Sequence, residues 1–249
     1  MGGKIDAYLD IASLYSYLAF YHLVKNQDLL AVHGVQIEIH PVLLGAINAA
    51  SGNKPPWTLP AKAKYGEFDA RRSSLRAGKP GIAPPQDFMA RSMTVIPLRA
   101  LCFIKKHYPI TAYQTAWHWL LHRFWELPHL NITKLEALAE ALAEAPAEYP
   151  PQPPSIAGAG DKLFSPAEVK KILEGAATQE IKDSVKASTQ EAIDRGAFGA
   201  PWFWAVNDKG KGEPFFGSDR FHFLYEFLGV PFQDIAILPP GSQSRDAKL

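Results

Sequence analysis

Ser13 lies where two hydrophobicity patterns meet, and this position gives its hydroxyl group a chemical use. Residues 5–11 alternate apolar and polar side chains as a β-strand does, whereas residues 15–32 have the apolar spacing of a helix. Ser13 is therefore predicted at a strand-to-helix corner, where the first backbone N–H groups of the helix lack internal partners and can stabilise an anion. A simpler interpretation, in which Ser13 only caps the helix, remains open from these residues alone.

Two later segments carry polar groups that suit a peptide ligand. A cis bond between Ala200 and Pro201 would turn the backbone N–H and C=O of Ala200 outward, ready to pair with an extended peptide. An ordinary proline at the start of a strand is the alternative. Ser218 and Asp219 open a predicted helix, whose N–H groups suit a carboxylate, while the Asp219 side chain suits an ammonium group. Together they would accept the zwitterion of an α-amino acid, although a capped helix with an acidic first turn has the same sequence.

Other residues with reactive side chains have a structural explanation. His118 and His122 are one helical turn apart and could share a metal ion, but no third ligand lies nearby in the sequence, so we expect surface or capping histidines and no metal. Cys102, the one cysteine, lies among apolar residues and is expected to be a small buried side chain. Ser13 and Ser16 have the spacing of the two cysteines in the Cys-x-x-Cys motif of disulfide oxidoreductases. Because neither side chain has a sulfur atom, disulfide exchange is excluded.

The composition is that of an ordinary globular protein. The 249 residues are 47% hydrophobic and 20% charged, with a net charge of +1, so no nucleic acid or membrane partner is expected. The first residues match neither a signal peptide nor a myristoylation site, and no apolar stretch approaches the roughly 20 residues of a membrane span. We therefore expect a soluble protein, and the single cysteine fits a reducing compartment.

The order of the predicted elements indicates the fold. Strands at 5–11 and 35–40 flank the first helix and form a βαβ unit, and strands at 202–206 and 214–216 form a hairpin before a helix at 219–228. This α/β order is a thioredoxin-like fold with an all-α domain inserted between the βαβ and ββα halves. The predicted domains are a thioredoxin-like domain, residues 1–59 and 197–249, and an inserted helical domain, residues 60–196.

Four segments resemble the kappa-class glutathione transferases, which share their fold with 2-hydroxychromene-2-carboxylate isomerases and the oxidoreductase DsbA. They follow one another in the family's order across nearly the whole chain, as Asp10 to Phe20, Ser51-Gly52-Asn53-Lys54-Pro55-Pro56, Gly196-Ala197-Phe198-Gly199-Ala200-Pro201 and Phe216-Gly217-Ser218-Asp219-Arg220. The resemblance implies a homodimeric enzyme that uses glutathione as co-substrate, with a site for a small hydrophobic electrophile facing the helical domain.

The resemblance also implies a role for each matching residue. Ser13 would donate a hydrogen bond to the glutathione sulfur, acting as a donor because no histidine and aspartate partners are evident to make it a nucleophile. The other residues implied in glutathione binding are Leu14 and Tyr15 at the thiol, Asn53 and Lys62 along the peptide, Ala200 and Pro201 at the cysteinyl backbone, and Ser218 and Asp219 at the γ-glutamyl end.

The main functional prediction is conjugation of glutathione to electrophiles, with peroxide reduction as a further activity. The alternatives are a glutathione-dependent isomerase of the hydroxychromene carboxylate type, and a protein that binds glutathione without catalysis. Leu14 stands where the family has proline, and the proline-rich residues 146–154 look like an addition to the helical domain. The last residues, Ala247-Lys248-Leu249, resemble a Ser-Lys-Leu peroxisomal signal, so a peroxisome is expected, with mitochondrial or cytosolic locations as alternatives.

Overall fold

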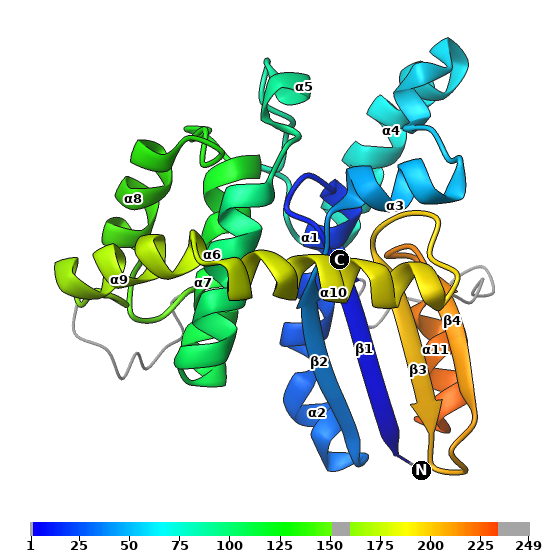
Figure 1. Ribbon diagram of the computed structural model, residues 1–249. Helices are drawn as coiled ribbons and strands as arrows, with labels where there is room; N and C mark the ends of the chain where they lie inside the picture. Colours follow the sequence, from blue (N-terminus) through cyan, green and yellow to red (C-terminus); the bar gives the residue numbers. More distant parts are fainter. Residues whose placement is uncertain (1, 151–159, 234–249) are drawn as a thin grey trace, which may run out of the picture.

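A four-stranded mixed sheet forms the centre of the molecule. The computed structural model describes residues 2–150 and 160–233. The strands lie in the order β2-β1-β3-β4, with β1 parallel to β2 and antiparallel to β3, and with β3 antiparallel to β4 (Figure 1). Their bounds are β1 Gly3–Leu9, β2 Val35–Pro41, β3 Trp202–Asn207 and β4 Gly212–Phe216. This topology confirms the predicted thioredoxin-like α/β fold.

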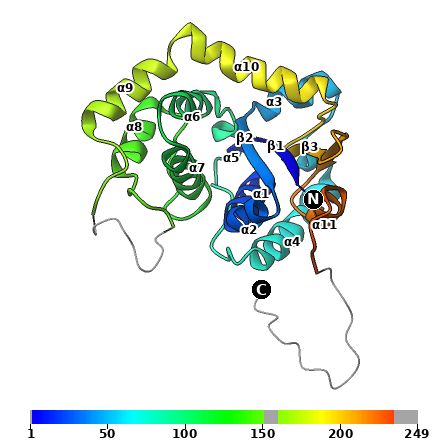
Figure 2. The same ribbon diagram turned by 90° about the horizontal axis from the view of Figure 1, so that it is seen from below.

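Helices cover both faces of the sheet. One side carries α1, α2 and α11, and α10 crosses the other side (Figure 2). In the first half of the chain the helices are α1 Leu14–Lys25, α2 Gln27–Val32, α3 Leu44–Ser51, the 3₁₀ helix η1 Pro56–Thr58, α4 Pro60–Arg76, α5 Phe88–Arg91 and α6 Val95–His107. In the second half they are α7 Ile110–Trp125, α8 Leu135–Glu144, α9 Pro166–Ala176, α10 Gln179–Asp194 and α11 Phe221–Leu228. None of the helices in the described ranges is long and apolar enough to cross a membrane.

β1 is buried along both of its faces. Leu9 and its alternate neighbours belong to the main core, whereas Tyr8 packs in a second cluster with Trp202 on the opposite face. A strand covered on both sides has no solvent-exposed face, so five consecutive residues at the end of β1 are buried. This burial fixes the end of β1, from which the chain turns directly into the Ser13 corner.

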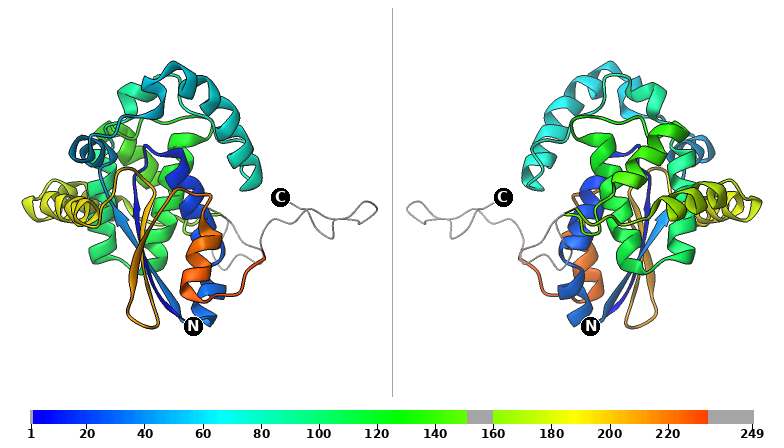
Figure 3. Two further views of the ribbon diagram at one scale, coloured as in Figure 1. Left: turned by 90° about the vertical axis from the view of Figure 1, so that its right-hand side faces the viewer. Right: turned by 90° about the vertical axis from the view of Figure 1, so that its left-hand side faces the viewer.

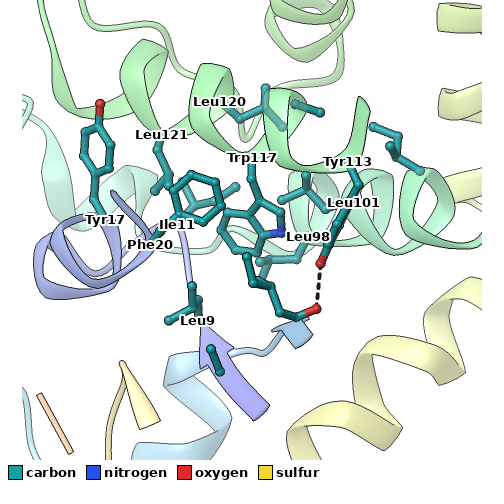
Figure 4. Packing of buried hydrophobic residues seen from close by; sticks show 14 of the residues in the cluster. Leu9, Ile11, Tyr17, Phe20, Leu98, Leu101, Tyr113, Trp117, Leu120 and Leu121 are labelled. Carbon is teal, nitrogen blue, oxygen red and sulfur yellow. Dashed lines mark hydrogen bonds between the residues drawn. The ribbon is translucent and has the colours of Figure 1, made fainter. Parts of the chain in front are cut away.

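The main core joins the sheet to the helices that follow it in sequence. Side chains of β1 and α1 pack directly against those of α6 and α7, with Trp117 at the centre (Figure 4). The Tyr113 hydroxyl donates a hydrogen bond of 3.0 Å to the Ile39 carbonyl in β2. The helical segment therefore packs against the sheet through a shared apolar core, while the predicted domain boundaries at 59/60 and 196/197 stay predictions.

Several predicted helix boundaries are wrong. The helix expected over 15–32 breaks at Asn26, whose φ of −107° and ψ of 6° leave the helical region and whose side chain bonds to the His22 carbonyl. α3 and the long helix α4 are not among the predicted elements, because residues 45–64 contain the turn-forming cluster Ser51-Gly52-Asn53-Lys54-Pro55-Pro56 and the segment that follows is polar and basic. α4 extends from the end of the molecule where β1 runs into α1 (Figures 1 and 3).

Candidate functional site

The Ser13 corner has the predicted local structure. Ser13 is the N-cap of α1, in an extended conformation, and its Oγ accepts a hydrogen bond of 3.1 Å from the Ser16 N–H. The next two N–H groups, of Leu14 and Tyr15, have no hydrogen-bond acceptor among the described residues. These two donors lie at the positive end of a twelve-residue helix and therefore favour an anionic ligand.

The fold brings Ala200 to this corner from a position 187 residues away in sequence. The Ser13 hydroxyl donates a hydrogen bond of 2.9 Å to the Ala200 carbonyl, and the Ala200–Pro201 bond is cis, as predicted. Ser13 and Ala200 are 7% and 8% exposed, so only a small part of each is open to solvent. The hydroxyl and the backbone of Ala200 can therefore act on the same bound group.

Asn53 reaches the segment that precedes Ala200. Its Nδ2 donates a hydrogen bond of 2.6 Å to the Phe198 carbonyl, and its Oδ1 accepts one of 2.9 Å from the Lys54 N–H. The Nδ2 bond thus joins the loop after α3 to the segment before β3, and the Oδ1 bond lies within the loop itself. Asn53 itself is exposed, so a ligand lying along this loop would meet its side chain.

Tyr15 connects the corner to α4. Its hydroxyl donates a short hydrogen bond to Asp69 of α4, a residue that the sequence patterns did not identify because α4 was not predicted. Burial raises the pKa of Tyr15, and the hydrogen bond to Asp69 and the charges of Asp69 and Asp219 raise it further. Among these causes burial is the largest.

Ser218 and Asp219 lie in a loop rather than in a helix, so the predicted helix start is wrong. α11 begins at Phe221, because Arg220 at its N-cap has a φ of −114° and a ψ of 23°, outside the helical region. The Gly217 N–H donates to the Pro201 carbonyl at 3.2 Å and so ties this loop to the Ala200 segment. Asp219 bonds to the Arg220 side chain at 2.9 Å, and both are exposed.

Lys62 is the predicted site residue that the structure does not join to the others. It lies exposed on α4, and within the described ranges no hydrogen bond or ion pair links it to another predicted site residue. Lys62 and Asp69 are seven residues apart and share one face of the helix, about 10 Å apart along its axis. Lys62 therefore extends from the face of α4 that the Tyr15–Asp69 contact turns towards the Ser13 corner.

The histidine prediction was wrong for His118. This side chain is 1% exposed, among Tyr17, Phe20, Tyr21 and Tyr149, and burial lowers its pKa to about 3. His122 is partly exposed and lies 3.4 Å from Glu126. Cys102 is buried as predicted, and burial raises the pKa of its thiol to about 12.

Potential metal ligands gather at one other place among the described residues. Asp6, Glu38 and His40 lie close enough to share an ion. The Asp6 carboxylate, however, already contacts Lys4 at 2.8 Å, His40 at 2.9 Å and Arg195 at 3.0 Å. Cations next to each oxygen oppose a metal ion, so this cluster is interpreted as an ion-pair network.

Comparisons with known proteins agree with this geometry. The chain is 28% identical to human glutathione S-transferase kappa 1 over 246 residues, which covers 97% of this chain and 96% of that protein. It is 27% identical to Caenorhabditis elegans glutathione S-transferase kappa 1 over 233 residues, 92% of each chain. The resemblance to kappa-class glutathione transferases is confirmed. A family model described as a DsbA-like thioredoxin domain matches residues 163–229.

A solved structure has a similar fold. The structure of a 2-hydroxychromene-2-carboxylate isomerase matches with a TM-score of 0.64 at 18% identity, covering 91% of this chain and 94% of that one. Identity at this level supports the fold alone. The DsbA-like thioredoxin fold, with helices between its two halves, is thereby established.

Proposed function

We propose that this protein is a glutathione transferase that conjugates the glutathione thiolate to small electrophiles. The observation that carries the proposal is the Ser13 hydroxyl at the open amino end of α1, 2.9 Å from the carbonyl that precedes cis-Pro201. The kappa-class relatives, which align with nearly the whole chain, support the same activity. Peroxide reduction is a second use of the same thiolate.

The chemical requirement is an ionised thiol. A free thiol has a pKa of about 8.5 and is mostly protonated at neutral pH. Each unit of lowering needs about 1.4 kcal/mol of preferential stabilisation of the thiolate. One hydrogen bond to a charged group supplies about 1.5–3 kcal/mol, and the open N–H groups of Leu14 and Tyr15 add to it. The Ser13 corner therefore has enough donors to lower the pKa by one or two units.

The hydroxyl must turn from Ala200 to the sulfur for this to happen. In the structure its proton points to the Ala200 carbonyl. If the cysteinyl N–H of glutathione donates to that same carbonyl, it competes with Ser13 and releases the hydroxyl for the thiolate. The sulfur electron pair then forms a bond to the electrophilic carbon. In a substitution, the bond from this carbon to the leaving group breaks, and the leaving group keeps the electron pair of that bond. In an addition, a carbanion forms next to the attacked carbon and takes up a proton.

The ends of glutathione would be bound away from the corner. Asn53 and Lys62 would hold the peptide along the loop after α3 and the face of α4. Ser218 and Asp219 would bind the γ-glutamyl carboxylate and ammonium groups, with the loop backbone replacing the helix end that the sequence predicted. Leu14 and Tyr15 would line the thiol site. We further propose a homodimer, and a small hydrophobic electrophile as the second substrate.

We also propose a peroxisomal location from the C-terminal Ala247-Lys248-Leu249, which lies outside the described residues. Deleting these three residues from a fluorescent fusion tests the location, and an unchanged punctate distribution would exclude the signal.

The proposed activity is tested by following glutathione and electrophile together. A transferase consumes the two in equal amounts and forms a conjugate. An isomerase of the hydroxychromene carboxylate type converts its substrate while the total glutathione stays constant. A binding protein without catalysis gives neither change. If a panel of electrophiles and hydroperoxides is tested and none gives either change, the proposal is refuted.

A further inference from the structure

A buried carboxylate lies at the end of β1, immediately before the Ser13 corner. Asp10 is 0% exposed, and three donors converge on it. Its Oδ1 accepts from the Ala12 N–H at 2.9 Å and from the Thr94 hydroxyl, and its Oδ2 accepts from the Leu44 N–H at 2.7 Å. The three donors come from the corner itself, the start of α3 and the start of α6. Asp10 therefore joins three separate parts of the fold at one point.

The Thr94 side chain binds Asp10 and does not cap its own helix. It is the N-cap residue of α6 and is fully buried, but its side chain makes no capping hydrogen bond to α6. A threonine at an N-cap normally accepts a hydrogen bond from its own helix, which is worth about 1 kcal/mol. Here the hydroxyl lies next to a carboxylate, to which a donor binds more strongly than to a neutral acceptor. The position is thus used to bind Asp10 in preference to capping α6.

The same corner has a second anchor in the helical segment. The indole N–H of Trp125, at the end of α7, donates a hydrogen bond of 2.7 Å to the Ile11 carbonyl. The Ser13 N–H donates to the Asp10 carbonyl at 3.1 Å. Each residue from Asp10 to Ser13 therefore has at least one fixed polar group, and two of the partners lie on α6 and α7. Burial raises the pKa of Asp10 to about 6, which leaves the carboxylate mostly ionised at neutral pH.

We propose that Asp10 is a positioning residue that, through its bond to Thr94, holds the Ser13 hydroxyl and the first N–H groups of α1 where the glutathione sulfur binds. The inference rests on the proposed function, since it concerns the same thiol. Asp10 does not touch the substrate. Its effect is geometric, and a displacement of about 1 Å at a reacting group can cost about 100-fold in rate.

The test compares three threonine variants. Thr94→Val removes the hydroxyl that donates to Asp10, whereas Thr94→Ser keeps it. Thr189→Val is the matched control, because Thr189 is also buried and its hydroxyl accepts from the Leu43 N–H at 3.0 Å, next to Leu44 but away from the corner. The measurements are the pKa of bound glutathione from its thiolate absorbance, KM for glutathione, kcat as a function of pH, and thermal unfolding.

We expect Thr94→Val to raise the pKa of the bound thiol by about one unit, from near 7 to near 8, and to lower kcat at neutral pH about fivefold. KM for glutathione should stay within about twofold, because the peptide ends are bound elsewhere, and kcat should recover above the new pKa. Thr94→Ser should behave as wild type. Thr189→Val should unfold at a lower temperature with the thiol pKa unchanged, as a purely structural substitution would.

Asp10→Asn provides an independent variant. Its amide nitrogen would face one of the hydrogen-bond donors that the carboxylate now accepts from, and the lost contact should displace the Ser13 corner as Thr94→Val does. If Thr94→Val and Asp10→Asn leave the thiol pKa where Thr189→Val leaves it, the positioning role is overturned while the proposed function stands. If wild-type protein itself leaves bound glutathione at the pKa of a free thiol, the proposed function fails, and this inference fails with it.

Discussion

Replacing Ser13 by alanine removes the side-chain donor on which the thiolate would depend. A hydrogen bond to a charged acceptor contributes about 1.5–3 kcal/mol, so its loss should raise the pKa of bound glutathione by about one to two units. A thiol with a pKa near 7 is about half ionised at neutral pH, and one near 8.5 only about 3%. For a rise of one to two units we therefore expect kcat at neutral pH to fall about 5- to 50-fold, and to recover at high pH.

The assay is the near-ultraviolet absorbance of the thiolate, titrated with pH on the saturated complex. Ser13 also accepts the Ser16 N–H as the N-cap of α1, so Ser13→Ala should lose about 1 kcal/mol of stability and unfold a few degrees lower. Ser74→Ala is the control, since Ser74 is equally buried and its Oγ has no hydrogen-bond partner among the described residues. A Ser13→Ala complex that titrates as wild type does would refute the reasoning.

Three further substitutions test other parts of the structure. Asn53→Asp places a carboxylate 2.6 Å from the Phe198 carbonyl, so the dissociation constant of glutathione should rise about fivefold, as equilibrium titration would show; an unchanged constant would contradict this. Gly175→Ala puts a Cβ 2.1 Å from the Phe103 ring and should cost about 1–3 kcal/mol of stability, seen as earlier thermal unfolding. Wild type should lose stability below pH 6.5, where only the unfolded chain protonates His118, and His118→Phe should lose less; parallel stability curves would contradict this.

The strand and cap positions were predictable from the sequence because they depend on near neighbours. The alternation before Ser13 and the helical spacing after it place the corner, and the structure confirms Ser13 as an N-cap. Ser165 and Thr178 carry the same local signal, a hydroxyl residue immediately before a helical spacing, and they cap α9 and α10. Since these elements occur in the order βαβ, helices, ββα, the thioredoxin-like topology follows from the rules of strand connection.

α4 shows where this reasoning fails. Its half-buried and buried positions are small or polar residues, such as Ala63, Ala70 and Ser74, whereas Tyr65 and Phe68 are 59% and 46% exposed. A pattern search based on large apolar residues finds no buried face in such a helix. Asp69 was missed for the same reason, and with it the contact that fixes Tyr15.

The sequence by itself determined which residue types stand at the corner, the cis-proline segment and the loop before α11, because each signal lies within a few neighbouring residues. Only the tertiary structure decided that Ser13 bonds to Ala200, which is 187 residues away, and that Thr94 is used to bind Asp10 and not to cap its own helix. Such contacts depend on how the helices pack against the sheet. That packing arises from the shared apolar core, which no local pattern specifies.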